Sequence, residues 1–283
     1  MTLPVLEKLQ TSSVYLPVMA HIRQVRQISQ TEKVLTIELP GGLALNHEPG
    51  QFVEVSVLGV GEAPISVCSS PSRSQDSFEI CVRRAGDLTG VIHSLKPGDP
   101  IGIRGPFGHG FPLKRFRGKD ILFAPGGLGL APARSLIQQV LDERHNYGRV
   151  IILYGARTPS ALLFKDDLAR WEQHGDIELH VSVDHSDENW KGNVGVITTL
   201  FSKIQIYARN TVAITVGPPV MYRFVLLELL GIGISEGNIY LSLERRMRCG
   251  VGKCGHCQMN HIYTCQEGPV FSYAQIKYLE EAL

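Results

Sequence analysis

Four of the six cysteines lie within 17 residues near the C-terminus and follow the spacing C-x4-C-x2-C-x7-C: Cys249, Cys254, Cys257 and Cys265. Thiolates are soft ligands that suit both iron–sulfur clusters and zinc. The first three cysteines have the spacing of plant-type [2Fe–2S] ligands, whereas zinc sites usually begin with a C-x2-C pair. We interpret the four residues as [2Fe–2S] ligands and keep a structural zinc knuckle as the alternative.

The residues between these cysteines fit a cluster-binding loop. Gly250, Gly252 and Gly255 would let backbone N–H groups turn toward the sulfurs. His256 also lies between two ligands, but a Rieske-type site needs two histidines in place of two cysteines, so we interpret it as a bystander. The other two cysteines, Cys68 and Cys81, stand in strand-like runs and are expected to be small buried hydrophobes.

Two glycine-containing turns could bind a nucleotide. Gly126, Gly127 and Gly129 lie in APGGLGLAP, between a strand-like and a helix-like run. There the chain can turn sharply, and the next helix offers its positive N-terminal end to a pyrophosphate, although such turns also occur without ligands. Gly217 and Pro218 lie in VGPPVMYRF, at the end of a later strand, where the alternative is a helix that simply begins with proline.

A fainter signal lies earlier in the chain. The turn from Gly86 to Thr89 precedes a helix-like run and could hold a phosphate through N–H groups and a hydroxyl. Arg83 and Arg84 precede it, and arginines in such positions are more often solvated charges than ligands. By itself this turn does not identify a site.

The elements that would position these residues change character twice along the chain. From about residue 21 to 112, short β-type runs alternate with turns, which predicts a small antiparallel barrel. From about 118, strands alternate with helices, which predicts a parallel sheet with right-handed crossovers. One of these helices, at 160–174, is expected to end with Gly175 as its C-cap. The last 43 residues are too few for a core of their own, and a metal site would stabilise them.

Composition narrows the class of protein. Hydrophobic residues make up 43% and charged residues 19% of the 283 positions, as in soluble globular proteins. The net charge of +1 gives no sign of nucleic acid or of an anionic membrane surface as a partner. We find no signal peptide and no apolar run long enough for a membrane span. The expected location is therefore cytoplasmic.

The order of these motifs resembles a known family. A barrel, then APIS (63–66), GDLT (86–89), GGLGLAP (126–132) and GPPVM (217–221) are similar to the ferredoxin–NADP reductase superfamily. The cysteine segment resembles the branch with a C-terminal [2Fe–2S] module. That branch contains the electron-transfer subunits of dihydroorotate dehydrogenase and of anaerobic sulfite reductase, and the gamma subunits of cytoplasmic NAD(P)-linked [NiFe] hydrogenases. The string from Glu244 to Tyr273 is most similar to the hydrogenase gamma subunits.

The resemblance implies an antiparallel FAD-binding β-barrel, a parallel-sheet NAD(P)-binding domain and a small iron–sulfur module. The implied boundaries are 1–15 for an N-terminal lead-in, 16–115 for the barrel, 116–238 for the α/β domain and 239–283 for the [2Fe–2S] module. The flavin residues would be Pro64, Ile65, Ser66, Val82, Arg83, Gly86, Leu88 and Thr89. The nicotinamide nucleotide would contact Gly126, Gly127, Gly129, Ala131, Pro132, Gly155, Ala156, Arg157, Gly217, Pro218 and Met221.

Three positions depart from the superfamily pattern. The barrel motif is often R-x-Y-S, and here Ala63 and Ile65 replace the arginine and the aromatic residue. The usual ring stacking and one phosphate salt bridge are therefore not expected. Val216 replaces a frequent cysteine before GPP, a residue that often helps to place the nicotinamide.

The implied activity is that of an oxidoreductase subunit whose cofactors do the chemistry. Hydride would pass between NAD(P)H and FAD, and single electrons would pass through the cluster to or from a partner. No catalytic side chain is required. The implied partners are a [NiFe] hydrogenase and an iron–sulfur subunit, or else a sulfite reductase or dihydroorotate dehydrogenase. A zinc-knuckle scaffold without catalysis and a self-sufficient NAD(P)H:acceptor reductase are the alternatives. The choice between NADH and NADPH stays open, because Arg157 could contact a 2′-phosphate or could be a surface charge.

Overall fold

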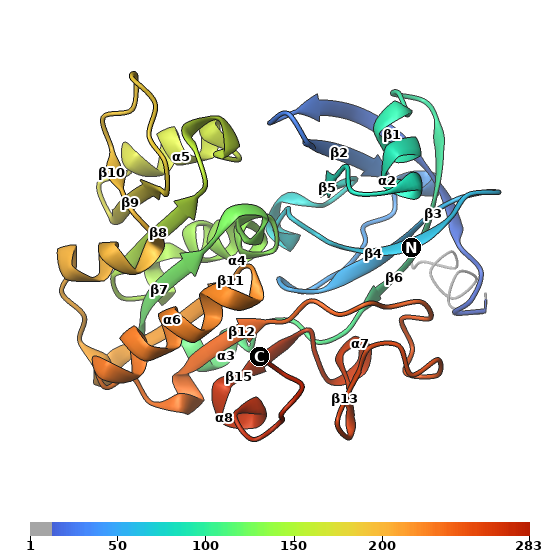
Figure 1. The fold of residues 1–283 in the computed structure, drawn as a ribbon. Coiled ribbons are helices and arrows are strands. Elements are labelled where there is room, and N and C mark those ends of the chain that lie inside the picture. The colour runs from blue at the N-terminus through green and yellow to red at the C-terminus, as the bar shows by residue number, and fades with distance from the viewer. Residues whose placement is uncertain (1–12) are drawn as a thin grey trace.

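The computed structural model describes residues 13–283, so most of the predicted lead-in at 1–15 lies outside the described residues. The described chain has three parts (Figure 1). A barrel stands beside a helix-covered sheet, and the C-terminal segment runs from that sheet to the underside of the barrel. The predicted fold class is confirmed: an antiparallel barrel comes first, followed by a largely parallel sheet.

The barrel is a sheet with strand order β4-β3-β6-β1-β2-β5. Its neighbours pair antiparallel, and an isolated bridge between Val67 and Ile80 joins the two ends of the sheet. Alternate residues such as Val53 and Val55 point inward and are fully buried, as the two-residue period of a strand requires. The strands are β1 (Val18–Gln27), β2 (Glu32–Glu38), β3 (Phe52–Val57), β4 (Gly61–Ser66), β5 (Phe78–Arg83) and β6 (Pro100–Phe107).

The second sheet has strand order β10-β9-β8-β7-β11-β12-β15. All neighbours pair parallel except β12 and β15 at one edge. The central strands are continuous buried runs, as expected for strands covered on both faces. The strands are β7 (Asp120–Pro125), β8 (Val150–Ala156), β9 (Ile177–Val183), β10 (Asn193–Val194), β11 (Thr211–Val216), β12 (Ile239–Ser242) and β15 (Val270–Ser272).

The helices follow the sequence pattern with one correction. The predicted C-cap at Gly175 is wrong, because α5 ends at Glu172 and its cap is Gln173. At its N-terminal end, Pro159–Ala161 form a separate short turn, and Phe164, in a left-handed conformation, caps α5. The observed helix is therefore shorter than the predicted one at both ends. The helices are α2 (Asp87–Ser94), α3 (Leu113–Phe116), α4 (Leu130–Asp142), α5 (Lys165–Glu172), α6 (Pro219–Gly231), α7 (Thr264–Glu267) and α8 (Tyr273–Ile276). None of the helices in residues 13–283 is long and apolar enough to cross a membrane.

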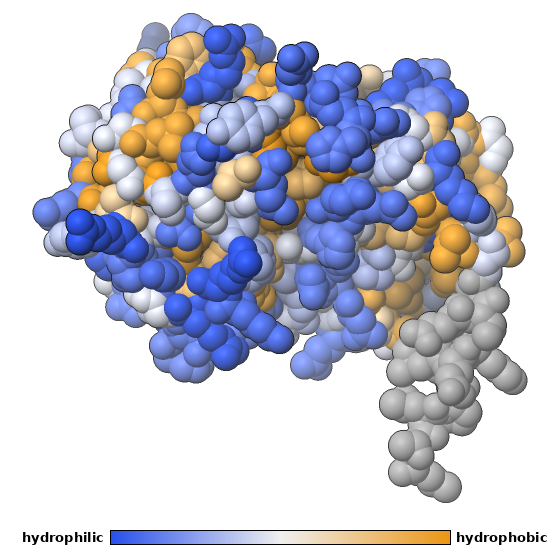
Figure 2. Space-filling model, turned by 90° about the horizontal axis from the view of Figure 1, so that it is seen from below, coloured by the Kyte–Doolittle hydropathy of each residue, from blue (hydrophilic) through white to orange (hydrophobic). Residues whose placement is uncertain are grey.

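The C-terminal segment does not form a core of its own. Phe271 and Ile276 pack into the apolar core on one face of the second sheet, and a short hairpin joins β13 (Gln258–Met259) to β14 (Ile262–Tyr263). Seen from below, the face of the molecule that carries this segment is covered mainly by hydrophilic residues, with apolar ones interspersed (Figure 2). Met247, Cys257 and Cys265 pack instead with Phe52 of the barrel, so the segment depends on both other parts of the chain for its burial.

Candidate functional site

A pocket of about 640 Å³ opens at the carboxyl ends of β7, β8 and β11. The chain runs from β7 outward through β8 and β9 and then returns to β11 on the other side of β7. In such sheets ligands bind at the point where the strand order reverses, which here lies between β7 and β11. The pocket therefore occupies the place where this topology predicts a nucleotide.

The glycine loop at 126–129 forms the floor of the pocket. Gly129 must be glycine, because a Cβ there would lie 2.1 Å from the carbonyl oxygen of Val216. Gly127 has φ +54° and no atom within 4 Å of its Cβ position, so its backbone faces open space that a ligand can enter. Beyond the loop, α4 directs its N-terminal end, with its positive dipole, toward this space.

The pocket gathers most of the nucleotide residues that the sequence predicted. Its lining includes Gly126, Gly127, Gly129, Gly155, Ala156, Arg157, Gly217, Pro218 and Met221. Ala131 and Pro132 do not reach it, because both are buried within α4. Successive residues of a helix point in different directions around its axis. Ala131 and Pro132 therefore follow the glycine loop in sequence but point toward the core rather than toward the pocket.

Charged side chains at the rim were not all predicted. Asp184 follows β9 and Glu244 follows β12, and both line the pocket together with Arg157 and Arg83. Asp184 could have been found from sequence, since it ends a strand at the same sheet edge. Desolvation raises the pKa of Glu244, and the positive charge of Arg83 offsets part of that shift. The short helical turn Ile197–Lys203, which closes another wall, carried no sequence signal.

The predicted flavin residues divide into two kinds. Pro64, Ile65 and Ser66 on β4 are half-buried, and Arg83 lines the nucleotide pocket while forming an ion pair with Glu32. By contrast, the Val82 side chain is buried in the barrel core, so only its main-chain atoms are free to contact a ligand, and the partly exposed Leu88 side chain packs against the same core.

The turn at the start of α2 also has an internal role. The Thr89 hydroxyl accepts hydrogen bonds from the N–H groups of Ala85 and Gly86, both at 2.9 Å, and donates to the carbonyl of Gly86. The turn is therefore already ordered, and Gly86 is exposed at the surface. Preordered N–H groups at a helix start are suited to phosphate binding.

The cysteine loop is shaped by its own backbone. The N–H groups of Val251, Lys253 and Cys254 point to the Cys249 sulfur at 3.3–3.4 Å. The N–H of Gly252 points to the Cys265 sulfur at 3.1 Å. The predicted turning of backbone N–H groups toward sulfur is thus observed, and hydrogen bonds of this kind stabilise a thiolate ligand.

The four thiols influence one another. Hydrogen bonding links the side chain of Cys254 to Cys249 and that of Cys265 to Cys257, and the charge of Cys249 also acts on Cys265. Among residues 13–283 no three His, Cys, Asp or Glu side chains converge where a single metal ion could sit. Tetrahedral zinc needs four ligands around one point, whereas a [2Fe–2S] cluster divides four thiolates between two irons.

The six cysteines differ in how far they are exposed to solvent. Cys254 is exposed and Cys249 is partly exposed, whereas Cys257 and Cys265 are buried. One side of the loop therefore faces solvent. The predicted burial of Cys68 and Cys81 is confirmed, with exposed fractions of 0% and 6%.

The cysteine loop lies directly on β3 and β6 of the barrel. Arg104 on β6 donates to the carbonyl of Cys249 at 3.1 Å and forms an ion pair with Glu62 on β4. A Cβ on Gly250 would lie 2.9 Å from the Phe107 ring and 3.3 Å from the Glu54 side chain. Glu54 is fully buried, both of its carboxylate oxygens lack a partner, and burial raises its pKa to about 7.

Comparisons with known families agree with this division into three parts. The family described as oxidoreductase FAD-binding domain matches residues 19–111. The oxidoreductase NAD-binding domain matches residues 123–226. The iron–sulfur cluster binding domain of dihydroorotate dehydrogenase B matches residues 244–277. The chain therefore combines FAD-binding, NAD-binding and iron–sulfur-binding domains of an oxidoreductase.

Relatives with known names match most of the chain. The chain is 40% identical to "Sulfhydrogenase 2 subunit gamma" of Pyrococcus furiosus, over 90% of this chain and 94% of the relative. It is 34% identical to a probable dihydroorotate dehydrogenase B electron transfer subunit of the same organism, over 82% of each. Among solved structures, the NADH-dependent reduced ferredoxin-NADP oxidoreductase matches with a TM-score of 0.74 at 24% identity, over 90% of this chain and 88% of that one. This last likeness concerns the fold.

Proposed function

This chain belongs to the family of FAD-, NAD- and iron–sulfur-binding electron-transfer subunits that includes sulfhydrogenase gamma subunits and those of dihydroorotate dehydrogenase B, and we propose that it connects NAD(P)H with a partner redox enzyme. In this proposal hydride passes between nicotinamide and FAD, and single electrons pass through a [2Fe–2S] cluster to or from the partner. Among these groups, a flavin can exchange both a hydride and single electrons.

The observation that carries the proposal is the position of the barrel between the two other sites. Arg83 at the end of β5 lines the nucleotide pocket, whereas Phe107 and Glu54 on β6 and β3 lie under the cysteine loop. β4, with the proposed flavin residues Pro64 to Ser66, pairs with β3 along its length. A flavin held there has the nicotinamide site on one side and the cluster site on the other.

The chain's own residues would position these groups and exclude water from them. We propose that Gly126, Gly127 and Gly129 hold the nucleotide pyrophosphate through backbone N–H groups, with Gly217, Pro218 and Met221 on the opposite wall. Pro64, Ile65, Ser66, Arg83, Gly86 and Thr89, with the main chain of Val82 and Leu88, would hold FAD. Cys249, Cys254, Cys257 and Cys265 would hold the cluster. The domain boundaries at 115/116 and 238/239 belong to the same proposal, as does a cytoplasmic location, which suits crowded metal-binding thiols.

Anaerobic reduction of the purified protein tests this function. Either NADH or NADPH should bleach the absorbance of bound flavin, and reduced protein should show the electron paramagnetic resonance (EPR) signal of one [2Fe–2S] cluster per chain. Protein that contains flavin and iron but is reduced by neither nucleotide would contradict the hydride step. Zinc in place of iron, in protein made with ample iron, would contradict the cluster.

The partner is proposed to be a [NiFe] hydrogenase with its iron–sulfur subunit. The relative at 40% identity is a sulfhydrogenase subunit, and the exposed Cys254 belongs to a segment that also carries the exposed cations Arg246, Arg248 and Lys253. A dihydroorotate dehydrogenase is the second candidate, because the cysteine segment matches that enzyme's iron–sulfur domain. Anaerobic affinity purification from the native source decides between them. A co-purifying protein with nickel supports the hydrogenase, and a co-purifying protein that oxidises dihydroorotate and holds no nickel supports the alternative.

A further inference from the structure

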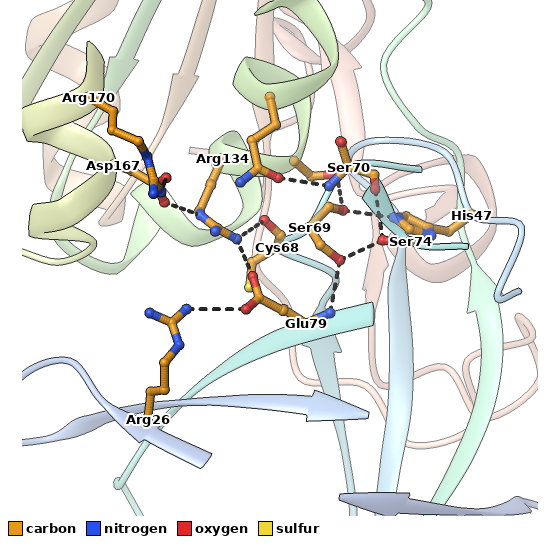
Figure 3. A network of polar contacts seen from close by, with 12 residues as sticks. Arg26, His47, Cys68, Ser69, Ser70, Ser74, Glu79, Arg134, Asp167 and Arg170 are labelled. Atoms are coloured by element: carbon orange, nitrogen blue, oxygen red, sulfur yellow. Dashed lines mark hydrogen bonds and ion pairs between the residues drawn. The ribbon is translucent and has the colours of Figure 1, made fainter. Parts of the chain in front are cut away.

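Arg134 is a buried charge that the proposed electron path does not use. It lies in the second turn of α4, the helix that follows the glycine loop, and only 5% of it is exposed. Its partners come from three other segments, in both the barrel and the second sheet domain (Figure 3). A buried arginine with this set of partners calls for a structural or functional reason, because leaving it unpaired would be costly.

The contacts of Arg134 to the barrel are direct. Its guanidinium donates to the carbonyl of Cys68 at 2.9 Å and to the Glu79 carboxylate at 2.7 Å. Cys68 lies two residues after Ser66, the end of the proposed flavin strand β4. Glu79 is on β5, where Arg26 also pairs with it at 3.2 Å. Arg134 is thus hydrogen-bonded to the barrel at two points, the chain just after the proposed flavin strand β4 and the strand β5.

Neighbouring residues of α4 repeat this attachment. The Ser135 hydroxyl donates to the carbonyl of Ser69 at 2.8 Å, and the side-chain oxygen of Gln138 accepts from the N–H of Ser70 at 3.0 Å. At the far end of the helix, Arg73 pairs with Asp142. The stripe of α4 that carries Arg134, Ser135, Gln138 and Asp142 is therefore bound to the connection between β4 and β5 and to β5 itself.

On its other side Arg134 holds the segment that begins α5. The guanidinium donates to Asp167 at 2.6 Å and lies over the Phe164 ring, 4.7 Å from its centre. The preceding residue, Leu163, donates its N–H to the Tyr154 hydroxyl, which in turn donates to the carbonyl of Gly127 at 3.3 Å. A closed ring of contacts therefore returns from Arg134 to the glycine loop.

The charges around Arg134 keep it ionised. Burial lowers the pKa of its guanidinium, but the negative groups around it, Glu79 and Asp167 among them, raise it, and the net shift is upward. Burial likewise raises the pKa of Asp167, while Arg134 and Arg170 lower it, with a net downward shift. The network therefore consists of ionised groups, whose hydrogen bonds are short and strongly directional.

We infer that Arg134 is a positioning residue, which fixes the glycine loop at 126–129 relative to the flavin strand and so sets the alignment of nicotinamide and flavin. This inference rests on the proposed function. Hydride transfer depends steeply on the distance and angle between the reacting rings, and a displacement of about 1 Å can cost about 100-fold in rate. Nucleotide affinity depends mainly on the loop itself and is expected to change much less.

The test compares anaerobic single-turnover reduction of flavin by saturating nucleotide in wild-type protein and in the variants Arg134→Gln, Arg134→Lys and Arg149→Gln. Rates are expressed per bound flavin, so that loss of folded protein does not enter. Arg134→Gln should reduce flavin about 100-fold more slowly and lose the long-wavelength charge-transfer absorbance of the nicotinamide–flavin complex. Arg134→Lys should recover part of both. Arg149→Gln, which removes an ion pair with Glu178 elsewhere in the same domain, should behave as wild type.

An unchanged rate and charge-transfer band in flavin-loaded Arg134→Gln would overturn the inference, because a purely structural residue changes stability and flavin content only. If Arg134→Gln does not accumulate with flavin, Ser135→Ala takes its place. That variant removes one hydrogen bond of the same face and should slow reduction by a smaller factor, and an unchanged rate would again overturn the inference. If neither nucleotide reduces the wild-type flavin, the proposed function fails and the inference fails with it.

Discussion

The nucleotide pocket and the cysteine loop are both proposed to hold a cofactor, but they differ in how much regular secondary structure forms them. The pocket is built from the ends of three buried strands and two helices, with a core behind it. The loop from Leu243 to Cys257 has no helix or strand and is shaped by N–H groups that point at sulfur. The pocket should therefore keep its form without its ligand, whereas the loop should depend on its cluster for order.

Loss of one thiolate should separate the two regions most completely. Cys254→Ser is expected to abolish or alter the EPR signal of the reduced cluster while NAD(P)H oxidation with an artificial dye persists, since that reaction needs only the pocket and the flavin. Cys81→Ala, which changes a buried cysteine of the barrel, should retain the signal. Equal loss of dye reduction in Cys254→Ser would show that the pocket depends on the loop.

A branched side chain in the glycine loop should have the converse effect. Gly127→Val places a β-branched residue at φ +54° and fills the open space above the loop. The added side chain would occupy space that the nucleotide enters, so we expect the nucleotide dissociation constant to rise about 10- to 100-fold, with the cluster signal unchanged. Gly175→Ala, at an open surface position, is the control. Wild-type affinity in Gly127→Val would remove the loop from the nucleotide site.

The cysteine loop rests on a buried carboxyl group, that of Glu54, so the stability of the protein should depend on pH. Glu54 under the cysteine loop is buried without a partner, and its pKa of about 7 lies above the ordinary value. The folded protein therefore binds this proton more tightly than the unfolded chain does, and stability is lost as pH rises from about 4.5 through 7. Glu54→Gln cannot ionise, so its advantage over wild type should grow by about 3 kcal/mol across this range.

Thermal unfolding at pH 5.5 and pH 8 measures this difference. The gap in melting temperature between Glu54→Gln and wild type should widen in favour of the variant at the higher pH. Glu38→Gln, at an exposed carboxylate of the same barrel, should show no such trend. A gap that is constant with pH would mean that Glu54 is not held protonated near neutrality.

The smallest effect is expected at the rim of the pocket. Asp184 is exposed and lines the pocket. Its negative charge should repel NADPH more than NADH, because only NADPH carries the extra phosphate. Asp184→Asn should lower the KM for NADPH by a factor of about 3 relative to that for NADH, as expected for a solvent-screened charge. Arg157→Gln should shift the ratio the opposite way. Steady-state kinetics with both nucleotides measures the ratio, and no change in either variant would place the adenosine phosphate elsewhere.

Much of this arrangement was predictable because it depends on local sequence. The period of two in the barrel, the strand–glycine–helix order at 120–142 and the cysteine spacing each report a short segment. The glycines at 126, 127 and 129 were predicted from their place in a strand–helix turn, and the structure brings them to one pocket. Thr89 was predicted in the same way from its place at a helix start, and its contact with a phosphate stays a prediction.

What escaped prediction depends on the register of side chains and on distant contacts. Val82 and Leu88 were predicted as flavin residues, but alternation along the strand buries the Val82 side chain, and the Leu88 side chain packs partly against the same core. Ala131 and Pro132 were predicted to face the nucleotide, and both lie buried in α4. Arg134 has the sequence context of an ordinary helix residue, and only the fold brings Glu79 and Asp167 to it.

The strand β15 carries a consequence for the making of this protein. It pairs with β12 at the edge of the second sheet, yet in the chain it comes only after all four clustered cysteines. Chains leave the ribosome from the N-terminus, so during synthesis β12 has no neighbour on its outer side among the residues already released. An unpaired strand edge invites association with other chains. The sheet edge is therefore covered only after the segment that receives iron has been released, and a chain that stops before β15 would leave that edge open.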